Sequence, residues 1–464
     1  MASKLEQLYP YVPVFAQNLG ISLFGLAWRH ERLGGRFEEH LAAFRERERW
    51  GAERLGDHVL GELQRTLLHA FAQVPFYRRR WAEAGISVGD LQSMTVGGLS
   101  RLPTTPKQDL RLAPESFVAQ NVADREKLHL YYSSGSTGTP ITAICTSDAH
   151  RRYIAAREAR SFGWAGTSVR KPRSMIGGRM VVPRGVSRGP FHRYNWIEKQ
   201  VYFSAYHIAP ANVREYMRAF NHHRPRVMTG YAYSHYILAR MMAEVGVTLD
   251  YEPDALVLGS EKLTPEMKVV IRQAFRARAY EEYGAVENCM LATECEHGSL
   301  HAHPDFGIIE IVDAQGQPVP PGVEGRILCT ALQNEAQPLV RYEIGDLGVW
   351  AESPCPCGRN NLPVLKEVVG RLEDVVVGPD GRQMVRFHGI FVDLPHVLEG
   401  QVIQEAPDRF IVKVVGRDGF GPAQEATIRQ RFAQRLGPVS VEIQRVPEIP
   451  RSARGKFRAV VRHF

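Results

Sequence analysis

The stretch Asn212–Tyr231, NVREYMRAFNHHRPRVMTGY, joins an amphipathic helix directly to a short strand. The pattern then repeats along the chain. YILARMMAEVG (236–246) is typical of a helix, DALVLGSEKL (254–263) of a buried strand ending in a loop, and PEMKVVIRQAF (265–275) of another helix. Alternating strands and helices predict parallel sheets that bind ligands at the carboxyl ends of their strands.

The regions on either side of this alternation have a different character. Residues up to about Asp109 are mainly helical, and Pro75 starts a new turn of helix. Residues 307–332 are two β-runs joined by a Gly/Pro-rich turn, as in an antiparallel β-subdomain. The tail contains an Asp-Gly hairpin (375–385), a helix ending at a glycine (422–437) and an edge strand (439–450).

The predicted fold class is therefore α/β with α+β. A large domain of parallel-type sheets and helices is expected over residues 1–373, including a helical segment (1–110) and a β-subdomain (about 307–370). A small mobile α+β domain is expected over 374–464. A length of 464 residues agrees with more than one domain.

Composition excludes several classes of protein. A hydrophobic content of 44% with 23% charged residues is typical of a globular protein. The net charge of +8 comes from scattered arginines rather than a basic arm, which argues against nucleic-acid binding and is compatible with anionic substrates. Six cysteines do not make a disulfide framework, and no secretory signal opens the sequence, so a cytoplasmic location is expected.

The stretch LYYSSGSTGTP (130–140) is a strand leading into a loop rich in hydrogen-bond donors. It is not a Walker loop, because no lysine follows the glycines. On its own it is also compatible with a polar surface turn. Backbone amides and hydroxyls could still wrap a triphosphate there. The residues concerned are Ser133, Ser134, Gly135, Ser136, Thr137, Gly138 and Thr139.

Four later stretches occur in a characteristic order. They are EEYGAVE (281–287), VRYEIGDLG (340–348), VVGRLEDVV (368–376) and PRSARGKFR (450–458). Together with the loop, they make the chain resemble the adenylate-forming superfamily of acyl-CoA synthetases, and within it the phenylacetate–CoA ligase family. The N-terminal stretch, the HAFAQVPFYRRRW helix and the VVVGPDGRQ hairpin look most like a branch associated with capsular polysaccharide synthesis.

The resemblance implies a role for each motif residue. The 133–139 loop would hold the β- and γ-phosphates of ATP, and a joint at Glu373 or Asp374 would let the small domain move. Lys456 would contact the α-phosphate and the substrate carboxylate. The remaining roles are adenine contacts for Gly259, Ser260, Glu261 and Tyr283, cofactor binding for Gly284, Mg²⁺ ligation for Glu287, ribose binding for Asp346, and ribose or phosphate contact for Arg371.

The expected activity is ATP-dependent activation of a carboxylic acid as its acyl adenylate, followed by transfer to the thiol of CoA. An aryl or arylacetic acid is expected, in a pocket lined by Tyr206, His207, Tyr231 and Tyr233, which could equally be core residues. The run VRFHGIFVDLPHVLE (385–399) departs from the family pattern, so an amine or a carrier-protein thiol are alternative acceptors. A non-catalytic nucleotide-binding scaffold is the alternative from a different class.

A second set of residues predicts a metal site. CEHGSLHAH (295–303) and SPCPCGR (353–359) supply the thiols and imidazoles that Zn²⁺ prefers, although neither spacing is that of a standard finger. The family resemblance favours Cys295, His301, Cys355 and Cys357 as ligands of a structural Zn²⁺. Free thiols with a surface histidine are the alternative.

The uncharged segment Tyr11–Trp28 is predicted to be a helix packed on the body of the protein. A weak contact with a membrane surface is the less favoured alternative. The oligomeric state is open.

Overall fold

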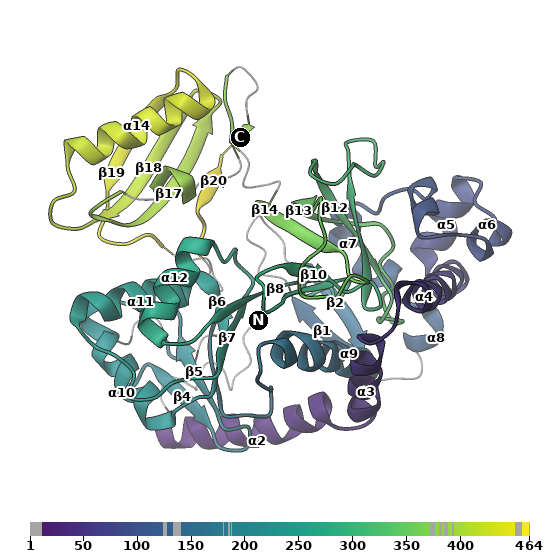
Figure 1. Cartoon of the computed structure of the whole chain (residues 1–464), viewed down its shortest axis with the longest axis horizontal. Helices are drawn as coiled ribbons and strands as arrows, with labels where there is room; N and C mark the ends of the chain where they lie inside the picture. Colours follow the sequence, from purple (N-terminus) through teal and green to yellow (C-terminus); the bar gives the residue numbers. More distant parts are fainter. Residues whose placement is uncertain are drawn as a thin grey trace.

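The computed structural model describes residues 12–123, 128–132, 141–179, 181–183, 186, 188–371, 376–379, 383–384, 388–391, 394–450 and 457–463. Within these residues a twelve-stranded sheet runs through the centre of the molecule (Figure 1). Its order is β11-β12-β13-β14-β10-β9-β8-β7-β6-β3-β5-β4. The strands are β3 (Arg173–Gly177), β4 (His192–Asn195), β5 (Gln200–Ser204), β6 (Val227–Tyr231), β7 (Ala255–Gly259), β8 (Ala279–Gly284), β9 (Leu291–Glu294), β10 (Leu300–Ala302), β11 (Gly307–Val312), β12 (Glu324–Ala331), β13 (Tyr342–Trp350) and β14 (Val364–Arg371).

The centre of this sheet is parallel, as the alternating pattern predicts. Strands β5, β3, β6, β7 and β8 pair in parallel, so their carboxyl ends meet at one edge. Local signals delimit the helices between them: Thr264 caps one helix by accepting the N–H of Met267, and Gly246 ends another in the left-handed conformation. These helices are α10 (Val213–His223), α11 (Ala232–Val245) and α12 (Pro265–Phe275).

One glycine in this region is required by the approach of two strands. Gly230 in β6 has a φ of +122°, and a Cβ built there would lie 1.9 Å from the carbonyl oxygen of Ile176 in β3. Any side chain at this position would therefore push the two strands apart.

The sheet continues as antiparallel strands toward β11. Strands β11 to β14 form the expected antiparallel run, and β11 pairs with β12 across the predicted turn. Pairing of β10 with β14, Leu300 opposite Leu365, connects this run to the central strands without a break. The predicted fold class is confirmed.

The N-terminal part is helical, as predicted. Helix α4 buries Leu63, Leu67 and Ala70 in a hydrophobic cluster that also includes residues of β11 and β12, and Pro75 is the first residue of α5. The helices of this part are α2 (Val14–Leu33), α3 (Phe37–Arg47), α4 (Ala52–Gln73), α5 (Pro75–Glu83), α6 (Val88–Gln92), α7 (Lys107–Leu112) and α8 (Gln120–Ala123). None of the described helices, α2 included, has both the length and the hydropathy needed to cross a bilayer.

The stretch that leads into the predicted phosphate loop is a strand, as expected. β1 (Leu128–Tyr132) pairs antiparallel with β2 (Thr142–Thr146), and α9 (Ser147–Arg157) follows. The two strands form a small sheet of their own, separate from the central one.

The C-terminal part has its own sheet and its own core, seen at the upper left of Figure 1. Its strands are ordered β19-β18-β17-β20, and β19 lies at the edge, as predicted. Arg240 of α11 donates to the carbonyl oxygens of Val397 and Leu398, so this sheet rests on α11. The domain boundary predicted near residue 373 adjoins residues 372–375, outside the described part, and stays a prediction. The elements are β15 (Val376–Val377), β16 (Gln383–Met384), α13 (His388–Phe391), β17 (Val397–Ala406), β18 (Arg409–Gly416), α14 (Pro422–Leu436), β19 (Ser440–Arg445) and β20 (Val460–Arg462).

Candidate active site and metal centre

Predicted site residues lie at the carboxyl ends of three neighbouring parallel strands. Tyr231 at the end of β6 is opposite Gly259 at the end of β7, and Gly259 is in turn opposite Glu282 in β8. Tyr283 and Gly284 complete β8. The strand order therefore gathers segments that are far apart in the sequence.

The turn after β7 is tied to the helix after β6. Ser260 has a φ of +64°, a left-handed conformation that is uncommon for a residue with a side chain. Glu261 accepts the backbone N–H of Tyr233 at 3.0 Å, so its carboxylate caps the N-terminus of α11. This contact is a structural role for Glu261, and the adenine role stays a prediction.

Tyr283 and the predicted ribose ligand Asp346 are directly bonded. The Tyr283 hydroxyl donates to Oδ2 of Asp346 at 2.8 Å. Desolvation and then the Asp346 carboxylate raise the pKa of Tyr283 well above its usual value, so the phenol keeps its proton and donates. Asp346 is also the register partner of Arg371, across β13 and β14.

Glu287, the predicted Mg²⁺ ligand, is held by a tyrosine that the sequence analysis did not select. The hydroxyl of Tyr342 donates to Oε1 of Glu287 at 3.1 Å, and both side chains are buried. Burial and then the Glu287 carboxylate raise the pKa of Tyr342, so it too remains a donor. Tyr342 lies inside the VRYEIGDLG stretch, but 55 residues separate it from Glu287 and no local spacing connects them.

The motifs also do not point to Lys107, a lysine close to the part of β13 that carries Asp346. Nζ of Lys107 donates to the carbonyl oxygen of Ile344 at 2.8 Å. Gly345, with a φ of +88°, follows directly, and a Cβ built there would lie 3.7 Å from this Nζ. A cation from α7 therefore lies beside the stretch of β13 that carries Asp346, which is a strand with a register shift rather than the turn that its Gly-Asp pair suggests.

The residues predicted to line the acid pocket differ in their burial and in their contacts. Nδ1 of His207 lies 2.7 Å from the Ser204 hydroxyl, and its ring stacks on Phe191, so it is placed as a core histidine. Tyr231 is buried, and its carbonyl oxygen lies 2.8 Å from Nδ1 of His235. The hydroxyl of Tyr206 donates to Gly178 at 3.4 Å.

Tyr233 is the pocket candidate that meets the C-terminal part. Its ring stacks on that of Phe457, with centroids 4.3 Å apart and planes inclined by 11°. Phe457 directly follows Lys456 in the sequence. Lys456 itself, the 133–139 loop and the Arg371 side chain lie outside the described residues, so their predicted contacts stay predictions.

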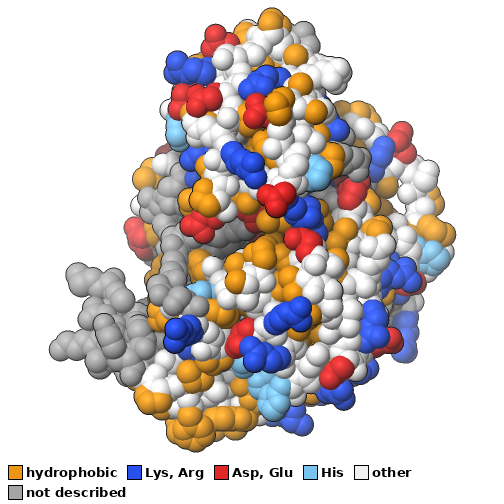
Figure 2. Space-filling model, turned by 90° about the vertical axis from the view of Figure 1, so that its left-hand side faces the viewer, with side chains coloured by type: hydrophobic (Ala, Val, Ile, Leu, Met, Phe, Trp, Pro, Cys, Tyr) orange, Lys and Arg blue, Asp and Glu red, His pale blue; other side chains and the backbone are white. Residues whose placement is uncertain are grey.

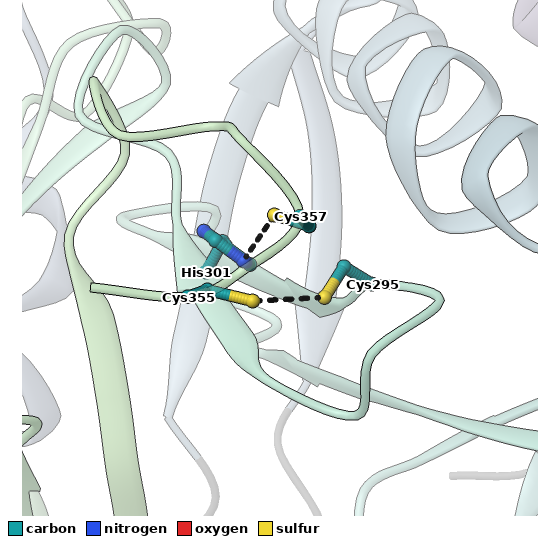
Figure 3. Close-up of side chains that lie close together, drawn as sticks. All are labelled: Cys295, His301, Cys355 and Cys357. Atoms are coloured by element: carbon teal, nitrogen blue, oxygen red, sulfur yellow. Dashed lines mark hydrogen bonds between the residues drawn. The ribbon is translucent and has the colours of Figure 1, made fainter. Parts of the chain in front are cut away.

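The four predicted zinc ligands come together (Figure 3). Cys295 follows β9, His301 is in β10, and Cys355 and Cys357 lie in the connection from β13 to β14. Their ligand atoms all lie within 4.8 Å of one another. The cluster therefore ties the connection between β9 and β10 to the connection between β13 and β14.

The separations inside this cluster suit a tetrahedral ion. The two sulfurs of Cys295 and Cys355 are 3.6 Å apart, and Sγ of Cys357 is 3.3 Å from Nε2 of His301. Bonds of about 2.1–2.3 Å at tetrahedral angles put neighbouring ligands roughly 3.5–3.8 Å apart. Nδ1 of His301 lies 3.4 Å from the carbonyl oxygen of Leu362, an outer contact typical of zinc-binding histidines.

The other two histidines of the motif do not join the cluster. Nε2 of His303 lies 2.8 Å from the Thr293 hydroxyl, and its ring packs on Trp164. His297 contributes its backbone N–H, which donates to Sγ of Cys295 at 3.4 Å. The donor set is three thiols and one imidazole, which fits a structural Zn²⁺.

Comparison with known proteins gives relatives of one kind. The CapK C-terminal domain family matches residues 377–463. Protein CapK of Staphylococcus aureus is 24% identical over an alignment covering 99% of this chain and 100% of CapK. Phenylacetate-coenzyme A ligase of Thermus thermophilus is 27% identical, with 68% of this chain and 70% of the ligase covered.

The fold is shared with a ligase of known structure. 2-Hydroxyisobutyryl-CoA ligase in its postadenylation state, in complex with 2-HIB-AMP, gives a TM-score of 0.69 at 22% identity, with 90% of this chain and 91% of that chain covered. Comparison with the same ligase in its thioesterification state gives a TM-score of 0.58. At this level of identity, the likeness shows that the two chains share their fold.

The fold and the relatives point to one class of protein, because both resemble those of ATP-dependent adenylate-forming ligases. Within that class, the chain is a CapK-like relative of the phenylacetate–coenzyme A ligases. The resemblance stated from the motifs is confirmed.

Proposed function

We propose that the protein activates a carboxylic acid with ATP as its acyl adenylate and then transfers the acyl group to the thiol of CoA. The observation that carries the proposal is the stacking of Phe457 on Tyr233. It brings the segment that follows Lys456 against the start of α11, next to the carboxyl end of β6, and β6 is separated by one strand from β8, which carries Tyr283. The phenylacetate-coenzyme A ligases among the relatives support the same reaction class.

The first half-reaction brings two anions together. A carboxylate oxygen of the acid bonds to the α-phosphorus of ATP, and the bond from that phosphorus to the β-phosphate oxygen breaks, releasing pyrophosphate. Lys456 would neutralise the carboxylate and the α-phosphate, and the 133–139 loop would hold the leaving group. Glu287 would hold Mg²⁺, which supplies charge neutralisation on the phosphate oxygens when bound.

The ribose would be held by Asp346, whose orientation is set by the Tyr283 hydroxyl at 2.8 Å. In the second half-reaction, the CoA sulfur bonds to the acyl carbon and the bond to AMP breaks. The small domain would have to turn away first, because Lys456 and the acceptor need the same cleft. Stacked aromatic rings at Tyr233 and Phe457 support an aryl or arylacetic acid as substrate.

Two other acceptors compete with CoA in the second half-reaction. The run VRFHGIFVDLPHVLE (385–399) lacks the pattern that receives pantetheine in phenylacetate–CoA ligases. An amine acceptor, giving an amide, or a carrier-protein thiol is therefore the second candidate.

The test separates the two half-reactions. The protein is incubated with ATP, Mg²⁺ and a panel of aryl, arylacetic and aliphatic acids, and pyrophosphate release is followed with hydroxylamine as the trap. CoA, amines or a carrier protein then replace the trap. We expect acid-dependent pyrophosphate release with an aryl acid and a CoA thioester as product. If no acid in the panel stimulates pyrophosphate release, the proposal is wrong. If the product is an amide, the acceptor is an amine rather than CoA.

Tyr342→Phe should raise the Mg²⁺ concentration needed for half-maximal pyrophosphate release by about five- to thirtyfold. The reason is that the buried Glu287 carboxylate loses a hydrogen bond whose net value is about 1–2 kcal/mol. A Mg²⁺ titration at saturating ATP measures the shift. Tyr283→Phe is the matched control, because it should raise the KM for ATP instead. Identical Mg²⁺ profiles for Tyr342→Phe and the wild type would contradict the positioning of Glu287 by Tyr342.

We further propose that the Cys295–His301–Cys355–Cys357 cluster binds a structural Zn²⁺. Protein purified without chelators should contain about one zinc per chain, and Cys295→Ser should lose most of it because one thiolate is removed. Cys145→Ser is the control, since Cys145 is a buried thiol outside the cluster. Elemental analysis is the measurement, and less than about half an equivalent in the wild type would overturn the site.

A further inference from the structure

Helix α2 exposes its apolar side chains and buries its polar ones. Phe15, Leu23 and Leu26 are 69%, 65% and 59% exposed, whereas Gln17 and Ser22 are each 4% exposed. A surface helix of a globular protein normally shows the opposite pattern. The sequence analysis favoured a helix packed on the body of the protein, and the structure adds that it packs through its polar side.

The reason for the inversion is that α2 covers the edge of the central sheet. β4 is the terminal strand, and an edge strand presents unpaired backbone groups. Oδ1 of Asn18 accepts the N–H of Tyr194 at 3.0 Å, and Oγ of Ser22 accepts the N–H of Trp196 at 3.0 Å. Polar side chains are needed on the inner face, so the apolar ones are left outside.

Packing inside the protein accounts for only part of the hydrophobic character of α2: Ile21 packs against the core, whereas the exposed apolar residues named above face outward. A cavity of about 400 Å³ lies beneath the helix, and its lining includes Ile21, Phe24, Trp28 and Tyr202. Phe24 is also 56% exposed. Beyond its contacts with β4, the helix therefore borders this space and solvent.

The exposed apolar surface continues from α2 into the turn between β4 and β5. Trp196 and Ile197 are exposed in that turn, and the ring of Trp196 lies 5.8 Å from that of Phe15. Figure 2 shows hydrophobic side chains gathered at the lower end of the molecule, where α2 runs in Figure 1. We call this surface the α2 face: Phe15, Leu19, Leu23, Phe24, Leu26, Trp196 and Ile197.

The rim of the α2 face is cationic. Residues 12–28 carry no charge, and the exposed Arg29 follows, its guanidinium donating to the carbonyl oxygen of Ile197 at 3.3 Å. Lys199 is exposed in the same turn. The first acid of α2, Glu31, is partly exposed and lies 4.0 Å from Nδ1 of His129. The α2 face thus combines aliphatic residues, a tryptophan and cations, the composition of an in-plane membrane contact.

We propose that the α2 face lies on the surface of an anionic lipid bilayer, with α2 parallel to the membrane plane. The apolar side chains would enter the boundary between headgroups and acyl chains, while Arg29 and Lys199 contact lipid phosphates. A second copy fits less well, because a two-fold interface would bring the cationic rims of two α2 faces together. The inference does not depend on the proposed ligase activity.

The test is co-sedimentation of the full chain with vesicles of equimolar phosphatidylglycerol and phosphatidylcholine, against vesicles of phosphatidylcholine alone. We expect binding to the anionic vesicles that weakens as salt is raised. The double variant Leu23→Gln/Leu26→Gln should lower the partition coefficient by roughly tenfold or more, because two largely exposed aliphatic side chains no longer enter the lipid. Arg29→Ala/Lys199→Ala should reduce the preference for anionic vesicles.

A control variant and measurements of stability and activity distinguish a loss of membrane binding from a loss of folding. Leu112→Gln/Val269→Gln removes two exposed apolar residues from other helices and should bind vesicles like the wild type. Thermal unfolding and acid-dependent pyrophosphate release without lipid should be unchanged in the Leu23/Leu26 variant. No wild-type binding, or equal binding by this variant, would overturn the proposal. If the wild type does not bind vesicles but self-associates, and the Leu23/Leu26 variant does not self-associate, the α2 face is a dimer interface instead of a membrane contact.

Discussion

The Lys456→Ala variant should release pyrophosphate about 10²–10³-fold more slowly than the wild type, because no cation then neutralises the carboxylate and the α-phosphate as they meet. The stacking of Phe457 on Tyr233 is the structural reason to expect the lysine segment at the site. Rates are measured with a saturating aryl acid, ATP and Mg²⁺, using hydroxylamine as the trap.

The second half-reaction should respond differently to the same change. Acyl transfer to CoA from a supplied acyl adenylate should stay within a few-fold of the wild type, because the reacting centre then no longer includes the triphosphate. Arg458→Ala is the matched control: it removes a cation from the same segment and should leave both steps nearly unchanged. Equal losses in the two half-reactions of Lys456→Ala would contradict a lysine that acts only in adenylation.

The Asp305→Ala variant should lower the free energy of unfolding by about 3–5 kcal/mol. Asp305 is fully buried and accepts two hydrogen bonds from Arg160, at 2.6 and 2.8 Å, and one from Arg47 at 2.7 Å. Removing the carboxylate leaves the buried guanidinium of Arg160 without this partner. Urea titration at neutral pH measures the change.

An exposed ion pair provides the comparison for this variant. Asp250 lies 3.0 Å from Arg224, and both side chains are more than half exposed. Asp250→Ala should cost less than about 1 kcal/mol, because water already solvates both charges. If both variants lose a similar amount of unfolding free energy, the burial of Asp305 does not explain the stabilisation by its ion pair.

The effect of Asp305 should also depend on pH. Burial alone would raise the pKa of Asp305, but the guanidinium groups of Arg160 and Arg47 outweigh it and hold that pKa well below its usual value. A carboxyl whose pKa is depressed on folding contributes its stability above the unfolded value of about 4, and this contribution fades as the pH falls below it. The difference in unfolding free energy between wild type and Asp305→Ala should therefore shrink below about pH 4.

Local patterns were sufficient to predict the elements. The boundary between α10 and β6, the start of α5 at Pro75 and the edge position of β19 follow from periodicity, proline and glycine placement within short windows. The alternation of strands and helices predicted the parallel order that brings Tyr231, Gly259 and Tyr283 to one edge.

Contacts between distant segments could not be predicted in this way. Tyr342 reaches Glu287 only because β13 takes a particular place in the sheet, and no spacing in the sequence records that place. The same holds for the selection of His301 rather than His297 or His303 as the imidazole of the metal cluster. The motif offered all three, family resemblance favoured one, and the strand positions bring that one to the thiols.

The sequence by itself determined the α/β class, the order of elements and the ligase resemblance, because each depends on residues close together in the chain. Only the tertiary structure decided which groups touch: the tyrosine donors on Asp346 and Glu287, the ring of Phe457 on Tyr233, and the outward face of α2. Those contacts arise from strand order and register, which join residues with no fixed separation along the chain.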